Sequence, residues 1–260
     1  MKRLLGHRDR DEDGEPVTAT TEASPTPETE RQAVESIAAY DELRAAFTAA
    51  VSHELRTPLA RLLVLLETAL LPGTDLEDLV GQARSEILQM KELIDDVLFL
   101  SELETGREAV ALGATPALPI LREVTSELAE RAARAGVTLA TEGDEDAQLP
   151  LRPRLLRTIA VNLAENAIRY AGPGAAFMLS IRSEGGSIVL TAADDGAGVN
   201  EDDLQRLFER FYRADRARAS RGTGLGLAIV KHVVAAAGGT VEATGARGEG
   251  LRIRCMFPSR

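Results

Sequence analysis

The chain has 260 residues, and 44% of them are apolar, which suffices for one large domain or for two modest domains and a tail. Its formal net charge of −11 argues against a nucleic-acid-binding protein, because such proteins normally present a basic surface. The single cysteine, Cys255, excludes an intrachain disulfide and favours a reducing compartment, the cytoplasm.

The N-terminal segment is acidic and contains several prolines. Residues 9–30 hold eight carboxylates and one arginine, and Pro16, Pro25 and Pro27 interrupt them. Such a segment cannot bury enough apolar area to order itself, so we predict a disordered tail or linker over residues 1–35. No stretch approaches 18 consecutive apolar residues, so we expect no transmembrane segment in this chain. A sensor region or partner absent from it could still associate the protein with a membrane.

Residues 34–70 read as one long helix with Pro58 inside it. Apolar side chains recur every four residues, at Phe47, Val51, Leu55 and Leu59. At 100° per residue, His53 falls on the opposite side of the helix, in water. An exposed imidazole is partly neutral at cell pH, so it can act as a nucleophile. The plain alternative is a solvated surface histidine.

A second helix follows a turn at residues 71–74, with Asp75 as its expected cap. Its apolar positions are spaced alternately by four and three residues, at Leu76, Val80, Ala83, Ile87, Met90, Ile94 and Val97. This heptad pattern ends near Thr105 and predicts a helical hairpin over residues 36–108. Two such hairpins would close a dimeric four-helix bundle. A coiled coil without chemistry is the alternative.

The periodicity changes near residue 113 and then alternates between helix and strand. The predicted helices are Pro119–Arg134, Leu155–Tyr170 and Leu225–Ala237. The predicted strands are Val137–Thr141, Phe177–Arg182, Ser187–Ala192, Thr240–Thr244 and Leu251–Phe257. Two of these strands alternate apolar and polar residues, so one sheet face should be buried under helices. We predict a two-layer α/β sandwich over residues 113–260, with Cys255 in its core.

Three clusters in this region carry candidate chemistry, and the first lies on the helix at residues 155–170. Asn162, Asn166 and Arg169 fall within an arc of roughly 60° along the edge of the apolar stripe. Amide oxygens are suitable ligands for Mg²⁺, and a guanidinium suits phosphate. Asparagines on a solvated helix surface are the alternative.

The second cluster, Asp194–Gly198, directly follows a predicted strand. An aspartate at a strand end can accept a hydrogen bond from an exocyclic amine such as that of adenine, and glycines allow close backbone approach. The third cluster, Gly222–Leu227, opens a helix, where unpaired N–H groups can bind phosphate oxygens. It has neither the P-loop nor the Rossmann spacing. Five arginines precede this cluster: Arg210, Arg213, Arg216, Arg218 and Arg221. We predict that they form a lid over polyphosphate, and a solvated charged loop is the alternative.

Order and spacing now point to a family. Residues 52–59, Ser-His-Glu-Leu-Arg-Thr-Pro-Leu, closely resemble the phospho-acceptor box of bacterial sensor histidine kinases. Residues 162–166, 194–198, 207–213 and 222–227 resemble the N box, first glycine box, phenylalanine box and second glycine box of their ATP-binding domain. These boxes occur in family order, and the resemblance covers residues 36–258. The chain thus looks like the catalytic core of such a kinase, with an α/β sandwich of the histidine-kinase/gyrase ATPase type. Asp195 departs from the family's frequent asparagine.

The resemblance implies a phosphoryl transfer from ATP to His53, with Glu54 as the general base. Thr57, one turn after His53, would support phosphatase activity toward a regulator, and a purely structural threonine is the equal alternative. The phosphoryl group would pass to an aspartate in the receiver domain of a response regulator. The implied protein is a homodimer.

The resemblance also implies the roles of the nucleotide-binding residues. Asn166 would hold Mg²⁺ with support from Asn162, and Arg169 and Arg213 would neutralise phosphate charge. Tyr170 would lie against adenine, and Asp194 would read its amino group. The remaining implied binding positions are Gly196, Gly198, Gly222, Thr223, Gly224, Leu225 and Gly226. Two rival classes stay open: an ATP-binding regulator or chaperone-type ATPase without phosphohistidine, and a protein acting mainly as a phosphatase or scaffold.

Overall fold

The computed structural model describes residues 27–105, 113–214 and 222–259, with side chains from Ala45 onward. By its contacts the chain divides into two units, Met1–Ala46 and Phe47–Arg260. Most of the predicted acidic tail lies outside the described residues.

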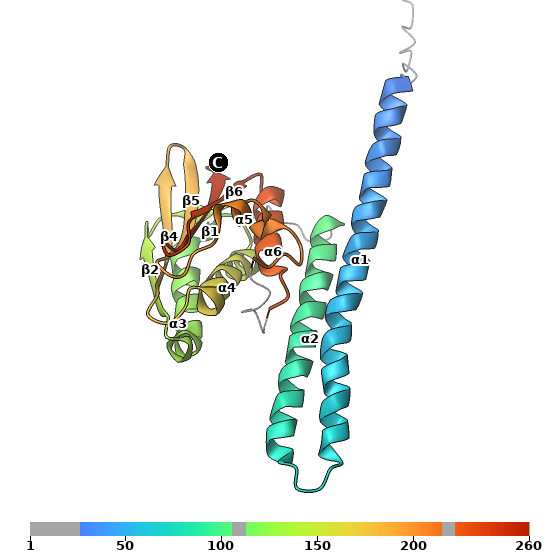
Figure 1. The fold of residues 1–260 in the computed structure, drawn as a ribbon. Helices are drawn as coiled ribbons and strands as arrows, with labels where there is room; N and C mark the ends of the chain where they lie inside the picture. The colour runs from blue at the N-terminus through green and yellow to red at the C-terminus, as the bar shows by residue number, and fades with distance from the viewer. Residues whose placement is uncertain (1–26, 106–112, 215–221, 260) are drawn as a thin grey trace, which may run out of the picture. The chain divides into compact units, whose positions relative to one another are not determined.

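Two helices form the predicted hairpin, α1 (Pro27–Ala69) and α2 (Leu76–Glu104) (Figure 1). The helix α1 begins at Pro27, so residues 27–35, which we predicted as disordered tail, are helical. A proline suits the first turn of a helix because its missing N–H would have no partner there. The helix continues through Pro58. Asp75 caps α2 as predicted, because its Oδ1 accepts hydrogen bonds from the N–H groups of Glu77 (3.0 Å) and Asp78 (3.2 Å).

The helix α2 carries two apolar faces, and only the heptad seam was predicted. Much of the predicted heptad seam is exposed in this single chain, with Leu76 at 58% and Val80 at 67% exposure. A second stripe is buried against the α/β domain, at Leu93, Leu100 and Leu103. We missed this stripe because its spacing of seven and three residues also fits a heptad, so the pattern does not separate it from the longer seam.

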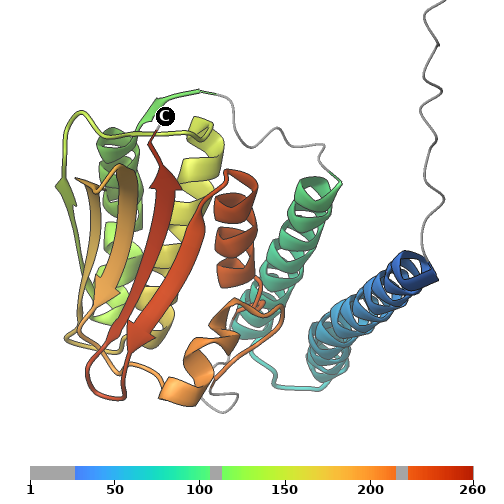
Figure 2. The ribbon, with the colours of Figure 1, turned by 90° about the horizontal axis from the view of Figure 1, so that it is seen from above.

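The α/β region is the predicted two-layer sandwich (Figure 2). Its mixed sheet has the strand order β2-β4-β5-β7-β6; β2 and β4 are parallel, and the other neighbours are antiparallel. The strands are β2 (Thr138–Gly143), β4 (Ala176–Glu184), β5 (Ser187–Asp194), β6 (Thr240–Gly245) and β7 (Leu251–Pro258). Three helices cover one sheet face: α3 (Ala117–Ala135), α4 (Pro153–Tyr170) and α6 (Gly226–Ala236). Among the described residues, no helix is apolar over a length that would cross a bilayer.

Four short elements were not predicted, because runs of two to four residues carry no periodicity. They are β1 (Thr115–Pro116), β3 (Gln148–Leu149), α5 (Glu201–Leu204) and the 3₁₀ turn η1 (Arg206–Phe208). The strands β1 and β3 pair with each other outside the main sheet. The elements α5 and η1 lie between the two glycine boxes, so they bear on the candidate site.

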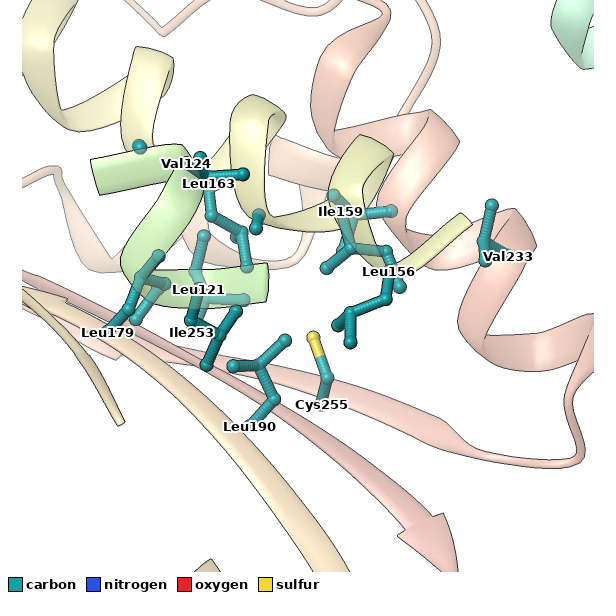
Figure 3. Close-up of a cluster of buried hydrophobic side chains, with 14 of the residues drawn as sticks. Leu121, Val124, Leu156, Ile159, Leu163, Leu179, Leu190, Val233, Ile253 and Cys255 are labelled. Atoms are coloured by element: carbon teal, nitrogen blue, oxygen red, sulfur yellow. The ribbon is translucent and has the colours of Figure 1, made fainter. Parts of the chain in front are cut away.

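The core lies between the sheet and its helices (Figure 3). Alternate side chains of β4 and β7 are buried, as predicted, and those of β7 include Ile253 and Cys255. Leu156, Ile159 and Leu163 of α4 face them from the helical layer. Burial raises the pKa of the Cys255 thiol to about 12, so this cysteine is an inert packing residue. The edge of α4 next to this packed face carries the N-box residues.

Candidate nucleotide and phospho-acceptor sites

His53 projects from α1 into solvent, with 74% of its side chain exposed. Its Nδ1 lies 3.6 Å from Oε1 of Glu54, the next residue in the chain. The hydroxyl of Thr57 donates to the backbone carbonyl of His53 across one helical turn, at 3.4 Å. The carboxylate beside Nδ1 can orient the ring and stabilise a proton there, which leaves Nε2 open as the attacking nitrogen. This arrangement is suited to a nucleophilic histidine.

A cavity of about 310 Å³ lies at the edge of α4. The predicted residues that line it are Asn162, Asn166, Arg169, Tyr170, Gly198, Arg213, Thr223, Gly224 and Gly226. They come from all four ATP-domain boxes, which are separated by up to 64 positions in the chain. The volume lies within the range of small-molecule sites.

The second glycine box lies directly on the N box. A Cβ atom at Gly226 would lie 2.5 Å from Oδ1 of Asn162, so a larger residue would displace that amide. Gly222 has φ +138°, and a Cβ there would lie 3.0 Å from Nη1 of Arg169. Glycine at both positions therefore permits the close approach of the second glycine box to α4.

Asp194 is the last residue of β5 and is partly buried. Burial raises the pKa of its carboxyl group, and hydrogen bonds from the backbone of Gly196 and Leu251 oppose that rise. The Gly196 N–H lies 3.0 Å from Oδ1. Asp194 and Gly196 are outside the cavity lining, while their neighbours Gly198 and Leu251 belong to it. Asp194 therefore lies behind the residues that line the cavity.

Two further predicted positions differ from the expectation. Leu225 is fully buried in the core and does not line the cavity. Gly222 lines a second, smaller cavity of about 120 Å³ together with Arg213, Glu54 and Thr57. This second cavity adjoins the phospho-acceptor box on one side and the second glycine box on the other.

Of the basic run before the second glycine box, Arg213 lines both cavities. Arg216, Arg218 and Arg221 lie outside the described residues. Arg210 does not cover the cavity as a lid, because it forms an ion pair with Glu104 at the end of α2. Its guanidinium also lies over the ring of Phe47, 5.0 Å from the ring centre, and 3.2 Å from Nε2 of His232.

Phe211 links the phenylalanine box to two other parts of the site. Its N–H donates to the carbonyl of Gly224 at 2.9 Å, and its ring centre lies 5.6 Å from that of Phe47. Its φ of +61° is in the left-handed region, which is unusual for a bulky residue. The phenylalanine box is therefore held between the second glycine box and the helix that carries His53.

Sequence reasoning missed the acidic contribution of α2 to the nucleotide cavity, which Glu92 and Asp96 line. Nη2 of Arg169 lies 2.6 Å from Oε1 of Glu92 and 2.7 Å from Oε2 of Glu165. The Thr223 hydroxyl donates to Oδ2 of Asp96 at 2.8 Å. No sequence signal marked these carboxylates, because a charged helix face usually indicates exposure to solvent.

The electrostatics of this wall reflect its burial. Burial raises the pKa of Asp96 to about 6, against the opposing effect of the Thr223 hydrogen bond. Burial would lower the pKa of Arg169, but the charges of Glu92 and Glu165 outweigh it and raise the pKa. The guanidinium is therefore charged, and it is held between two carboxylates.

Comparison with known proteins accounts for both parts of the chain. Residues 43–106 match the His Kinase A phospho-acceptor domain, and residues 151–260 match the histidine kinase-, DNA gyrase B- and HSP90-like ATPase family. The fold is therefore a phospho-acceptor hairpin joined to an ATPase domain of that class. The chain belongs to the sensor histidine kinases and contains their catalytic core.

Individual relatives agree with this assignment. A sensor-like histidine kinase SenX3 of Mycolicibacterium smegmatis is 35% identical over 82% of this chain and 56% of its own length. A crystal structure of full-length ShkA with AMPPNP is 31% identical, with a TM-score of 0.59 over 81% of this chain and 45% of that one. A structure of histidine kinase ThkA with the response regulator TrrA shares the fold, with a TM-score of 0.66 at 18% identity over 90% of this chain and 66% of that one. The chain spans about half the length of the curated relatives it matches.

Proposed function

We propose that this chain transfers the γ-phosphoryl group of ATP to His53 and then to an aspartate of a response regulator. The observation that carries the proposal is the combination, in one chain, of a solvent-exposed imidazole beside Glu54 and a cavity lined by four ATP-domain boxes. An ATPase without phosphohistidine would not need the first of these. Incubation of the purified protein with [γ-³²P]ATP and Mg²⁺ tests the proposal, and label should appear on the protein.

Different residues of the chain have different roles in this phosphoryl transfer. Glu54 orients the imidazole and takes the Nδ1 proton as Nε2 bonds to the γ-phosphorus, while ADP leaves with the bridging oxygen. Arg213 lines both cavities, so its guanidinium can neutralise the negative charge of the phosphoryl group in either one. Phosphoryl transfer requires mainly positioning and charge neutralisation, which these residues supply.

The cavity also suits the magnesium ion that such a transfer needs. Asn166 lines the cavity and presents an amide to it. An amide oxygen is a hard donor of the kind that Mg²⁺ prefers, so we assign Asn166 as its protein ligand, with Asn162 in support. When bound, such an ion would supply positive charge that offsets part of the negative charge of the phosphates.

The partner chemistry follows from the same family. ThkA, a histidine kinase of the same fold, has been solved with a response regulator, and we propose that a receiver domain also docks beside His53 of this chain. ATP and such regulators are cytoplasmic, so we propose that this core works there. The proposed domain boundaries, residues 36–108 and 113–260, enclose the two matched family ranges.

Thr57 gives a test of phosphatase activity. Its hydroxyl is exposed one turn beyond His53, where it could position a water for attack on a phosphoaspartate. Thr57→Ala is expected to spare most His53 labelling and to slow dephosphorylation of the cognate regulator, roughly tenfold or more, since one positioned catalytic group contributes at least that much. The decay of purified phosphorylated regulator measures the effect. Equal decay with wild type and variant would leave Thr57 a structural residue.

The exposed seam of α2 predicts self-association. Leu76, Val80, Ile87 and Ile94 are large apolar residues on one helix face, each more than 40% exposed. A second copy of the hairpin would cover them in a four-helix bundle. We therefore expect a dimeric mass by light scattering at micromolar concentration. Val80→Glu should shift the protein toward monomer, whereas a monomeric wild-type protein would contradict the prediction.

A further inference from the structure

One arginine of the phenylalanine box, Arg210, contacts both helices of the hairpin. Its guanidinium forms an ion pair with Glu104, the last residue of α2, and lies 5.0 Å from the ring centre of Phe47 on α1. Only 19% of the Arg210 side chain and 30% of the Glu104 side chain are exposed. Solvent therefore screens this charge pair less than it would screen a surface pair, and the face of an aromatic ring attracts a cation at that distance. Arg210 thus joins the ATPase domain to both helices.

The backbone directly after Arg210 is fixed as well. Phe211 has a φ of +61°, a conformation that costs a bulky residue free energy and persists only where its surroundings hold it. Its N–H donates to the carbonyl of Gly224 at 2.9 Å, and its ring centre lies 5.6 Å from that of Phe47. A Cβ atom at Gly224 would lie 2.9 Å from Cα of Phe211, so the two backbones are in direct contact. The turn at Arg210 and Phe211 is therefore held by the hairpin on one side and by the second glycine box on the other.

This turn leads directly into Arg213. Arg213 follows Phe211 by two residues and, like Thr223, lines both cavities. Arg210 and Glu104 line neither cavity, so their contact adds no group to the nucleotide site. Phosphoryl transfer depends on the placement of charged groups, and a displacement of about 1 Å can cost about 100-fold in rate. A turn released from the hairpin would let Arg213 move relative to the acceptor helix.

We propose that Arg210 is a positioning residue for phosphoryl transfer. Its contacts with Glu104 and Phe47 hold the phenylalanine box on the hairpin, and this keeps Arg213 between the two cavities. The inference rests on the proposed phosphoryl transfer and assigns the residue pair that aligns it. Arg210 acts through Arg213 and not on the phosphates themselves. Its loss should therefore slow the transfer and leave ATP binding unchanged.

Two substitutions that keep a polar side chain remove the charge pair. Arg210→Gln and Glu104→Gln each remove one of the two charges, and the double variant completes a mutant cycle. Arg210→Lys keeps a positive charge but has no planar guanidinium. Arg254→Gln is the matched control, because Arg254 forms an ion pair with Glu184 at 2.6 Å within the sheet and lines neither cavity. It removes the same charge as Arg210→Gln and a similar contact between distant segments.

The rate of labelling at saturating [γ-³²P]ATP and the dissociation constant of ATP by calorimetry, both on the full chain with Mg²⁺, test the proposal. Arg210→Gln and Glu104→Gln should each be labelled about tenfold more slowly than wild type, with ATP affinity within about twofold. The double variant should be no slower than Arg210→Gln, because its second substitution removes an interaction that is already lost. Arg210→Lys should be labelled at an intermediate rate, and Arg254→Gln should match wild type.

Three results would overturn the positioning role. A wild-type rate of labelling in Arg210→Gln would show that the contact aligns nothing. A loss in the double variant that multiplies the two single losses would show that Arg210 and Glu104 act separately. A loss of ATP affinity as large as the loss of rate would assign Arg210 to nucleotide binding. If the wild-type protein binds ATP but is not labelled, the proposed phosphoryl transfer itself is wrong, and this inference fails with it.

Discussion

His53→Gln is expected to reduce phosphorylation of this protein by ATP to background. Glutamine keeps a polar side chain of similar length on an exposed helix position, so the fold should be retained. It has no nitrogen lone pair that can attack phosphorus, because its amide nitrogen is conjugated with the carbonyl. The wild-type label should be lost in acid and retained in base, as expected for a phosphoramidate.

Two controls sharpen this result. His232 lies 3.2 Å from Arg210, and burial lowers its pKa, so it is a partly buried histidine of the ATPase domain. His232→Gln should leave labelling largely intact, which shows that loss of label is specific to the acceptor helix. Acid-labile phosphate on the His53→Gln protein would show that another residue accepts the phosphoryl group.

Asn166→Ala and Asp194→Asn are expected to abolish productive use of the nucleotide. Asn166→Ala removes the proposed magnesium ligand, and labelling should fall by roughly 100-fold or more, as for loss of one preorganised electrostatic contact. Asp194→Asn replaces a charged acceptor for the adenine amine by a neutral amide, and ATP affinity should fall by roughly 10- to 100-fold. Labelling assays and calorimetry measure the two effects.

The circular dichroism of both variants should match that of wild type, since neither residue belongs to the buried apolar core. Asn200→Ala is a suitable control for Asn166→Ala, because Asn200 also lines the cavity but is exposed and hydrogen-bonded only to Asp203 in the described contacts. Normal ATP binding and normal labelling in both test variants would place the pocket elsewhere.

The long elements and the nucleotide motifs were predictable from the sequence, because each depends on a local pattern. The seven-residue stripe of α2, the alternation in β7 and the glycine spacing at residues 222–226 each extend over enough positions to be distinctive. The predicted positions Asn162, Asn166 and Thr223 accordingly lie around one cavity.

The contacts between distant segments were not predictable. Glu92 and Asp96 have the composition of an ordinary solvated helix face, and only the three-dimensional structure shows Arg169 and Thr223 opposite them. Arg210 was predicted as part of a lid over polyphosphate or of a solvated loop. It instead forms an ion pair with Glu104, which is more than 100 positions away in the chain. Local sequence specifies which chemical groups are present, whereas tertiary packing decides which of them meet.

The two apolar faces of α2 have a mechanical consequence. Leu93 lies against the ATPase domain, and Ile94, the next residue, belongs to the exposed seam, so the two directions differ by about 100° around the helix axis. A continuous helix of 29 residues turns as one body. Any twist that changes how Ile94 packs must therefore turn Leu93 and its neighbour Glu92 through the same angle. The helix therefore couples packing at the exposed seam to the position of Glu92 beside the nucleotide cavity.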